Sequence, residues 1–468
     1  MYAGCKRTSS SLTAYVTERV MEQPHALLVA SPGLGHLIPI LELGNGLSSV
    51  LNFRVTVLAV TSGSSSLAET EAIRAVVARG TCEVTELPSV DIDYFFEPDA
   101  TVFTKIVEKM RATKPVVQDA IKLMTQKPTV MIVDFLGTGM MSIADDVGMA
   151  KYVYVASHAW FLAVLVYLPV LDKVVEGEYI DIKEPMKIPG CRPVGADDLM
   201  ETMLDRSNRH YRECVRYGEE VPMSDGVLVN TWEELQGNTL AALMEDGELS
   251  RVMKVPVYAI GPIWWNAVFR ANDRTCMWIR VKWSKVYVGS AQGQSWAKPN
   301  ETLASGPALV LRKPTSYLRE SSNDDDLVSV GLPEGFLDRT RGMGLVVTQW
   351  APQVEILSHG SIGVPIVAWP LYAEQWMNAA FLTEEIGVAI RTSELPSKRV
   401  ISREEVASLV RKFMGEEDEE GRKVRAKAEE VRVSTERAWT QGGSSQSSLL
   451  EWAKRCCLLS FTNNTVSI

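Results

Sequence analysis

The chain has 468 residues and a net charge of −10, and 46% of its residues are hydrophobic while 23% are charged. These values are typical of a soluble protein large enough for two domains, and the negative charge argues against nucleic acid or an anionic membrane as a partner. No apolar run reaches the roughly 18 residues that a membrane-spanning helix needs. The seven cysteines lack the spacing of a disulfide framework, so we expect reduced thiols and a cytoplasmic protein.

The first half of the chain alternates short apolar strands with helical segments. Residues 1–20 are rich in Ser and Thr, and we interpret them as an extension before the fold, with a transit peptide as the weaker alternative. From residue 21 the alternation predicts a parallel, doubly wound α/β sheet and a first domain that ends near residue 261. Strands are expected at 25–30, 54–60, 82–87, 129–134, 151–155, 226–230 and 253–261, and helices after residue 33 and at 67–78 and 139–147.

A second α/β domain is expected over residues 262–458, followed by a tail at 459–468. Its beginning, residues 264–306, contains five tryptophans and no lasting periodicity, although 286–290 could be the remnant of a strand. Further strands are expected at 344–349 and 364–368, each followed by a helix; Pro352 suits the first turn of one, and the other carries Glu374 and Gln375. Three charged amphipathic helices are expected at 402–414, 416–439 and 443–457.

His36 follows a glycine-rich turn and lies in or near the first turn of a predicted helix. The helix dipole opposes protonation at that end, and a neutral imidazole is what a general base must be before it accepts a proton. A histidine that only caps or packs at the helix start is an equally good interpretation of the pattern alone.

Asp134 ends an apolar strand and is therefore expected at the same sheet edge as His36, where open α/β sheets bind ligands. The alternative is an N-cap for the helix that follows. Neither an HExxH motif nor a Cys/His cluster occurs, and a GxSxG elbow is also missing, so we expect no metal site and no hydrolase chemistry.

Three motifs resemble those of plant family 1 UDP-glycosyltransferases. They are PGLGHLIP at residues 32–39, VDFLG at 133–137, and a signature box that opens with WAPQ at 350–353 and closes with PLYAEQ at 370–375. The middle of this box is missing after Gly363. The hydroquinone (arbutin-forming) glucosyltransferases are the group that the chain resembles most. The resemblance implies a GT-B-like fold, with two Rossmann-like domains facing a cleft and the second domain incomplete.

The resemblance also implies a reaction and its residues. The chain would transfer glucose from UDP-glucose to a small phenolic acceptor with inversion, as a monomer and without a cofactor or metal. His36 would act as general base and Asp134 would orient it, while Phe135 and Leu136 would border the acceptor. The residues implied for binding the donor are Trp350, which stacks on uracil, Ala351, Gln353, and the pair Glu374 and Gln375, which binds the hexose hydroxyls.

Two alternatives remain open at this point. The chain could be a catalytically impaired relative that binds acceptor but holds the donor weakly, because the missing part of the box is the one that holds the diphosphate in the family. It could also be a faulty gene model of an active enzyme, because both the missing segment and residues 264–306 could arise at mis-spliced exon edges.

Overall fold

The computed structural model describes residues 23–263, apart from 62–66, 89, 91, 93–100 and 246, and then residues 287–289, 366–370, 374–394, 401–414 and 418–463. The predicted extension at 1–20, the strand at 344–349 and the helix beginning near Pro352 lie outside these residues. So does the tryptophan-rich stretch at 264–306, apart from 287–289.

The described part of the first half forms a sheet of seven parallel strands in the order β3-β2-β1-β4-β5-β6-β7. The chain moves outward in one direction from β1 and in the other from β4, so these neighbours mark the topological switch point. The predicted alternation is confirmed, although the last strand covers only 257–259 of the predicted 253–261, because Met253 ends a helix and Pro256 precedes the strand. The strands are β1 (His25–Ala30), β2 (Arg54–Ala59), β3 (Glu83–Glu86), β4 (Val130–Asp134), β5 (Ala150–Val155), β6 (Gly226–Val229) and β7 (Val257–Ala259).

Helices cover both faces of this sheet, which explains why the central strands are apolar throughout. In β1, Leu27 and Val29 face one core cluster, while Ala26 and Leu28 face the other. The apolar run at 159–170 becomes the first part of α5, and nearly all residues of this part are buried. The helices of this part are α1 (Leu34–Leu51), α2 (Leu67–Arg79), α3 (Val102–Leu123), α4 (Met141–Val147), α5 (Ala159–Val174), α6 (Arg209–Glu220), α7 (Glu233–Met244) and α8 (Glu248–Met253).

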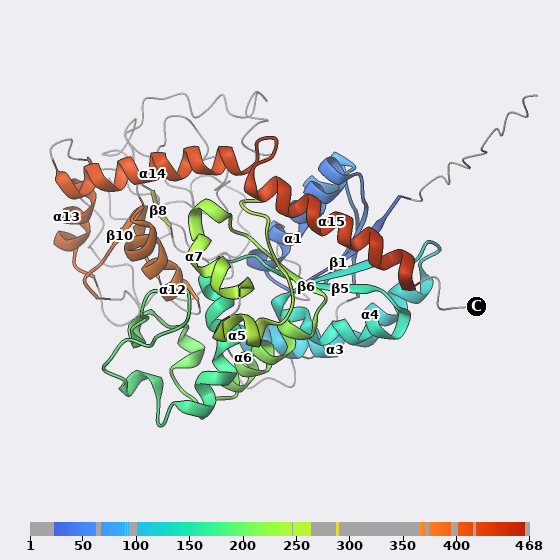
Figure 1. Cartoon of the computed structure of the whole chain (residues 1–468), viewed down its shortest axis with the longest axis horizontal. Helices are drawn as coiled ribbons and strands as arrows, with labels where there is room; N and C mark the ends of the chain where they lie inside the picture. Colours follow the sequence, from blue (N-terminus) through green and yellow to red (C-terminus); the bar gives the residue numbers. More distant parts are fainter. Residues whose placement is uncertain are drawn as a thin grey trace, which may run out of the picture.

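A second parallel sheet is described with three strands in the order β10-β9-β8. The strands predicted at 286–290 and 364–368 are confirmed as neighbours, β8 (Tyr287–Gly289) and β9 (Ile366–Ala368), and β10 (Ala389–Arg391) lies beyond β9. Beside this sheet lie α12 (Gln375–Ala380), a π-helical turn (Phe381–Ile386), α13 (Arg403–Met414) and α14 (Glu419–Ala438), on the left of Figure 1. None of the described helices combines the length and apolar character that crossing a membrane would require.

The last helix, α15 (Ser444–Asn463), returns to the seven-stranded sheet, whereas α14 runs beside the other one (Figure 1). Trp452 is fully buried there, stacked on Phe53 and edge-on to Tyr152 with ring centroids 5.6 Å away in each case. The predicted start of the tail at residue 459 is wrong, because no Gly or Pro interrupts the helix after 457 and it continues to Asn463.

Removal of residues 443–468 should therefore destabilise the protein. The truncation exposes the cluster against which Leu449 and Trp452 are buried, and burying each such side chain is worth about 1.5–3 kcal/mol. We expect the free energy of unfolding to fall by about 3–6 kcal/mol, as measured by denaturant titration. A chain that lacks only residues 464–468 is the control and should melt like the full chain. Unchanged unfolding after the longer truncation would show that α15 is dispensable.

Candidate active site

His36 and Asp134 meet at the switch point between β1 and β4. Gly33, at the N-cap of α1, has a φ of 100°, a conformation that favours glycine and turns the chain sharply from the strand into the helix. His36 therefore lies in the first turn of α1. Its Nδ1 is 3.0 Å from Oδ2 of Asp134, and their side chains are 24% and 3% exposed. The pair that the sequence placed on one sheet edge is in direct contact.

The carboxylate of Asp134 is held by bonds to its other oxygen. Oδ1 accepts hydrogen bonds from the hydroxyl of Ser31 at 2.6 Å and from the backbone N–H groups of Leu136 and Gly137 at 2.9 and 3.1 Å. Asp134 is therefore the N-cap of the short 3-10 helix Phe135–Met140 and the partner of His36 at the same time. The two interpretations of this residue are both correct, and the cap fixes the carboxylate for its contact with the imidazole.

The pKa of His36 is raised above its ordinary value. Burial is the largest single influence and lowers the pKa, but it is outweighed by the charge of Asp134, the hydrogen bond to Asp134 and the charge of Glu374. The helix dipole opposes protonation of this imidazole, but the two carboxylates that face the ring raise its pKa nevertheless. The arrangement stabilises the imidazolium, the form that a general base reaches after it has taken a proton.

A cavity of about 180 Å³ opens beside His36, and both halves of the chain contribute to it. The ring of Phe135 packs at 6.1 Å from His36 and edge-on to Phe161 at 5.2 Å, so one wall is aromatic. The lining residues are Gly35, His36, Pro39, Asp134, Phe135, Tyr154, Ala156, Ser157, Phe161, Glu374 and Asn378. The cavity therefore offers aromatic surface for a flat apolar ring, and Glu374 and Asn378 add polar groups to its lining.

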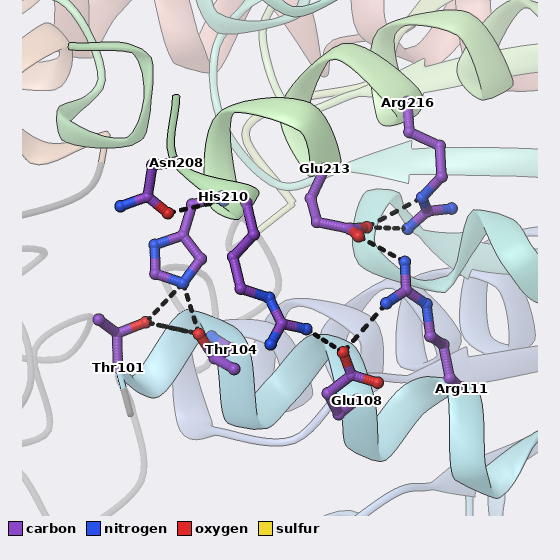
Figure 2. A network of polar contacts seen from close by, with 9 residues as sticks. Thr101, Thr104, Glu108, Arg111, Asn208, His210, Glu213 and Arg216 are labelled. Carbon is purple, nitrogen blue, oxygen red and sulfur yellow. Dashed lines mark hydrogen bonds and ion pairs between the residues drawn. The ribbon is translucent and has the colours of Figure 1, made fainter. Parts of the chain in front are cut away.

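A network of charged side chains stiffens the wall behind Phe135. The ring of Phe135 packs edge-on against Tyr217 of α6 at 5.9 Å. Helix α6 is joined to α3 by ion pairs in which Arg111 bridges Glu108 and Glu213 (Figure 2). Arg209 pairs with Glu108 and Arg216 with Glu213, while Nε2 of His210 contacts the hydroxyls of Thr101 and Thr104. Single exposed pairs contribute little, but these pairs share partners and join α3 to α6 at two points.

The predicted site residues differ in where they lie. Glu374 lines the cavity at the N-cap of α12, and Gln375 is the first residue of that helix. Phe135 lines the cavity, whereas Leu136 is 4% exposed in the core and is not among the lining residues. Trp350, Ala351 and Gln353 lie outside the described residues.

Several residues in or near the cavity were not predicted from the sequence, among them Ser157, His158, Phe161 and Asn378. The first two lie two and three residues after β5, which ends at the same edge as β4, so the reasoning applied to Asp134 would have found them. Asn378 follows Glu374 by four residues, the spacing that places two side chains on one face of a helix.

Comparison with known proteins places the chain among plant enzymes. It is 68% identical over 474 residues to UDP-glycosyltransferase 72D1 of Arabidopsis thaliana, covering 94% of this chain and 100% of that relative. It is 34% identical to the hydroquinone glucosyltransferase of Rauvolfia serpentina, covering 92% and 97% of the two chains. The resemblance to the hydroquinone group is therefore real, but the chain is much more similar to a different plant glycosyltransferase.

The fold has solved counterparts as well. The crystal structure of TcCGT1 in complex with UDP superimposes with a TM-score of 0.82 at 34% identity, over 93% of this chain and 100% of that chain. No protein-family model matches the chain. The two parallel sheets and the cavity between them are thus those of a GT-B enzyme, and the long alignments cover nearly the whole chain. The chain belongs to the plant UDP-glycosyltransferase family, whose members transfer a sugar from a UDP-sugar to a small acceptor.

Proposed function

We propose that this glycosyltransferase moves glucose from UDP-glucose to the hydroxyl of a small phenolic acceptor, with His36 as the general base. The contact between His36 and Asp134 at the mouth of a partly aromatic cavity is the observation that carries the proposal. Nδ1 of His36 faces Asp134, so Nε2 is the nitrogen that remains to take the phenolic proton. A free phenol has a pKa of about 10, so proton removal during attack accelerates the reaction at neutral pH.

The geometry supports an inverting transfer in one step. The phenolic oxygen attacks the anomeric carbon from the side opposite to UDP, its proton passes to His36, and UDP leaves with the bonding electrons. Asp134 keeps the proton of the neutral ring on Nδ1 and then stabilises the imidazolium. Phe135 and Phe161 support the aromatic ring of the acceptor, and Glu374 faces the hexose.

The residues of the signature box bind the nucleotide of UDP-glucose in this proposal. Trp350 stacks on uracil, Ala351 and Gln353 complete that part of the site, and Gln375 joins Glu374 at the hexose. The support is the motif pattern together with the printed names of similar proteins, among them a glucosyltransferase of hydroquinone and a structure that contains UDP. No metal or cofactor has a role in this scheme.

A second candidate, a catalytically impaired transferase, has its own support. The alignment with the Arabidopsis thaliana relative has 474 positions and includes all of that protein. It covers 94% of this chain, which is about 440 of its 468 residues, so fewer residues of this chain are aligned than there are positions. Part of the relative therefore has no counterpart in this chain. A loss within the signature box, after Gly363, would leave the acceptor side intact and weaken the hold on the diphosphate.

The same proposal includes a monomer in the cytoplasm. Among the described cysteines, Cys82, Cys191, Cys214 and Cys456 form no disulfide, as expected in a reducing compartment. A fluorescent fusion and the sedimentation of the purified chain test these two statements.

The function is tested by product analysis on the full chain. The purified protein is incubated at high concentration with UDP-glucose and either hydroquinone, other simple phenols or aliphatic alcohols of similar size. We expect slow formation of phenolic glucosides and release of UDP, with much less product from the alcohols because they lack a ring for the aromatic wall. Mass spectrometry measures the products. Preferred transfer to the alcohols, or from another UDP-sugar, would contradict the proposal.

A further inference from the structure

The start of α5 is bound to α12 through one histidine. His158 is the N-cap of α5, and its Nδ1 accepts the backbone N–H of Phe161 at 3.2 Å. Its Nε2 lies 2.9 Å from Oδ1 of Asn378 on α12, and its ring stacks on Phe381 with centroids 4.1 Å apart and planes 17° from parallel. The two bonds and the stacking fix the position and the plane of the imidazole.

These contacts determine which nitrogen of His158 carries the proton. Burial lowers the pKa of His158 to about 4, against the opposing effect of the hydrogen bond to Asn378, so the ring is neutral at pH 7. Nδ1 accepts a backbone N–H and therefore bears no proton, which leaves the proton on Nε2. Nε2 is thus a donor, and the atom of Asn378 that faces it must be the carbonyl oxygen. The orientation of the Asn378 amide follows from this chemistry.

The amide nitrogen of Asn378 is then turned away from His158. Within the described part of the chain, no hydrogen bond involves this nitrogen, and Asn378 lines the cavity that contains His36. Asn378 lies one helical turn after Glu374, whose carbonyl accepts its backbone N–H at 2.9 Å, so both side chains occupy the same face of this helical segment. The amide N–H of Asn378 therefore has a fixed direction and lies beside the carboxylate of Glu374, the residue assigned to the sugar of the UDP-sugar.

We propose that the Asn378 side-chain N–H donates a hydrogen bond to a hydroxyl oxygen of the hexose on the UDP-sugar, and that His158 is the positioning residue that aims it. This inference rests on the proposed function, because it takes the ligand beside Glu374 to be the transferred sugar. The aromatic acceptor lies on the other side of the cavity, against Phe135 and Phe161. The hydrogen bond from His158 to Asn378 also explains why a histidine is the N-cap of α5, where Ser, Thr, Asp or Asn would cap equally well.

Two substitutions of His158 separate its two roles. His158→Asn places an amide oxygen near the position of Nδ1, so it can still cap α5 but cannot reach Asn378. His158→Gln places an amide N–H near the position of Nε2, so it can still donate to Asn378 but no longer caps the helix. Asn378→Leu keeps the approximate volume of the side chain and removes the donor itself.

Calorimetry on the full-length proteins then compares UDP-glucose with UDP. We expect Asn378→Leu and His158→Asn to weaken UDP-glucose binding about tenfold while UDP binding changes less than twofold, the effect of one lost hydrogen bond to the sugar. His158→Gln should keep the wild-type ratio of the two affinities and melt at a lower temperature. Because the pKa of His158 is about 4, the ratio should be constant between pH 6 and 8.

Several results would overturn the inference. Equal losses of UDP and UDP-glucose affinity would show a structural role only, and unchanged affinities would show no role. The absence of measurable UDP-glucose binding by the wild-type chain would also contradict it. The same holds if a variant loses affinity for a phenol while its affinity for UDP-glucose is unchanged. Failure of the proposed function is distinguishable: wild-type protein that binds UDP-glucose with the expected variant pattern but never glucosylates phenols would leave the sugar contact standing.

Discussion

Replacement of His36 by alanine is expected to lower the turnover of phenol glucosylation roughly 10²–10⁴-fold, the range for removal of a general base. The imidazole lines the cavity, and apart from the phenol of Tyr154 the other titratable side chains in its described lining are the carboxylates of Asp134 and Glu374, which are weaker bases than an imidazole. Binding of UDP should remain nearly unchanged, because His36 is assigned to the acceptor side. Steady-state kinetics and calorimetry measure the two effects. Wild-type turnover in this variant would remove the mechanism.

Asp134→Asn is the matched control for the same mechanism. The substitution keeps an oxygen for Ser31, Leu136 and Gly137, so the cap of the 3-10 helix survives, but it replaces the charged Oδ2 that faces His36. Only neutral His36 is a base, so the rate of the wild type rises as the pH passes through the raised pKa. Loss of the Asp134 charge should shift this rise to lower pH and slow turnover. A slower enzyme with an unshifted profile would indicate a structural role.

The first domain was largely predictable from the sequence because its signal is local and strong. Its apolar strands are buried on both faces and show as short continuous runs, and the polar residues that end them, such as Asp134, mark the edge where ligands bind. The strand ends placed His36 and Asp134 on one sheet edge, and the family resemblance implied that the two side chains pair. Leu136 was placed at the acceptor from its position in a motif, but the turn of the 3-10 helix directs it into the core while Phe135 faces the cavity.

The rest of the site depends on contacts that no local pattern encodes. Asn378 and His158 are 220 residues apart, and their bond exists only because α12 docks against the start of α5. The raised pKa of His36 likewise depends on Glu374, a residue of the other half of the chain. The helix dipole is visible in a sequence, but the carboxylates that outweigh it come together only in the folded protein.

Restoration of the signature box should accelerate this enzyme more than any single substitution could. The departing UDP accumulates negative charge on its diphosphate, and the family pattern supplies donors for it from backbone amides at a helix N-terminus and a histidine. These donors belong to the segment that the motif pattern predicts to be missing after Gly363. Loss of one such donor costs roughly 10²–10³ in rate, and the predicted gap would remove several together. We therefore expect slow turnover and weak UDP-glucose binding from the chain as it stands.

The experiment inserts a family-like segment between Gly363 and Val364 and replaces residues 264–306 with their counterpart from the 68% identical relative. The rate of phenol glucosylation should rise by roughly 10² or more, because the diphosphate regains its donors while the acceptor side, built on His36 and Phe135, is already in place. The same graft in the His36→Ala background is the control and should stay slow, since a better leaving group does not replace the base. If the ungrafted chain already turns over as fast as the grafted one, residues outside the familiar box must hold the diphosphate, and the site would have to be sought among them.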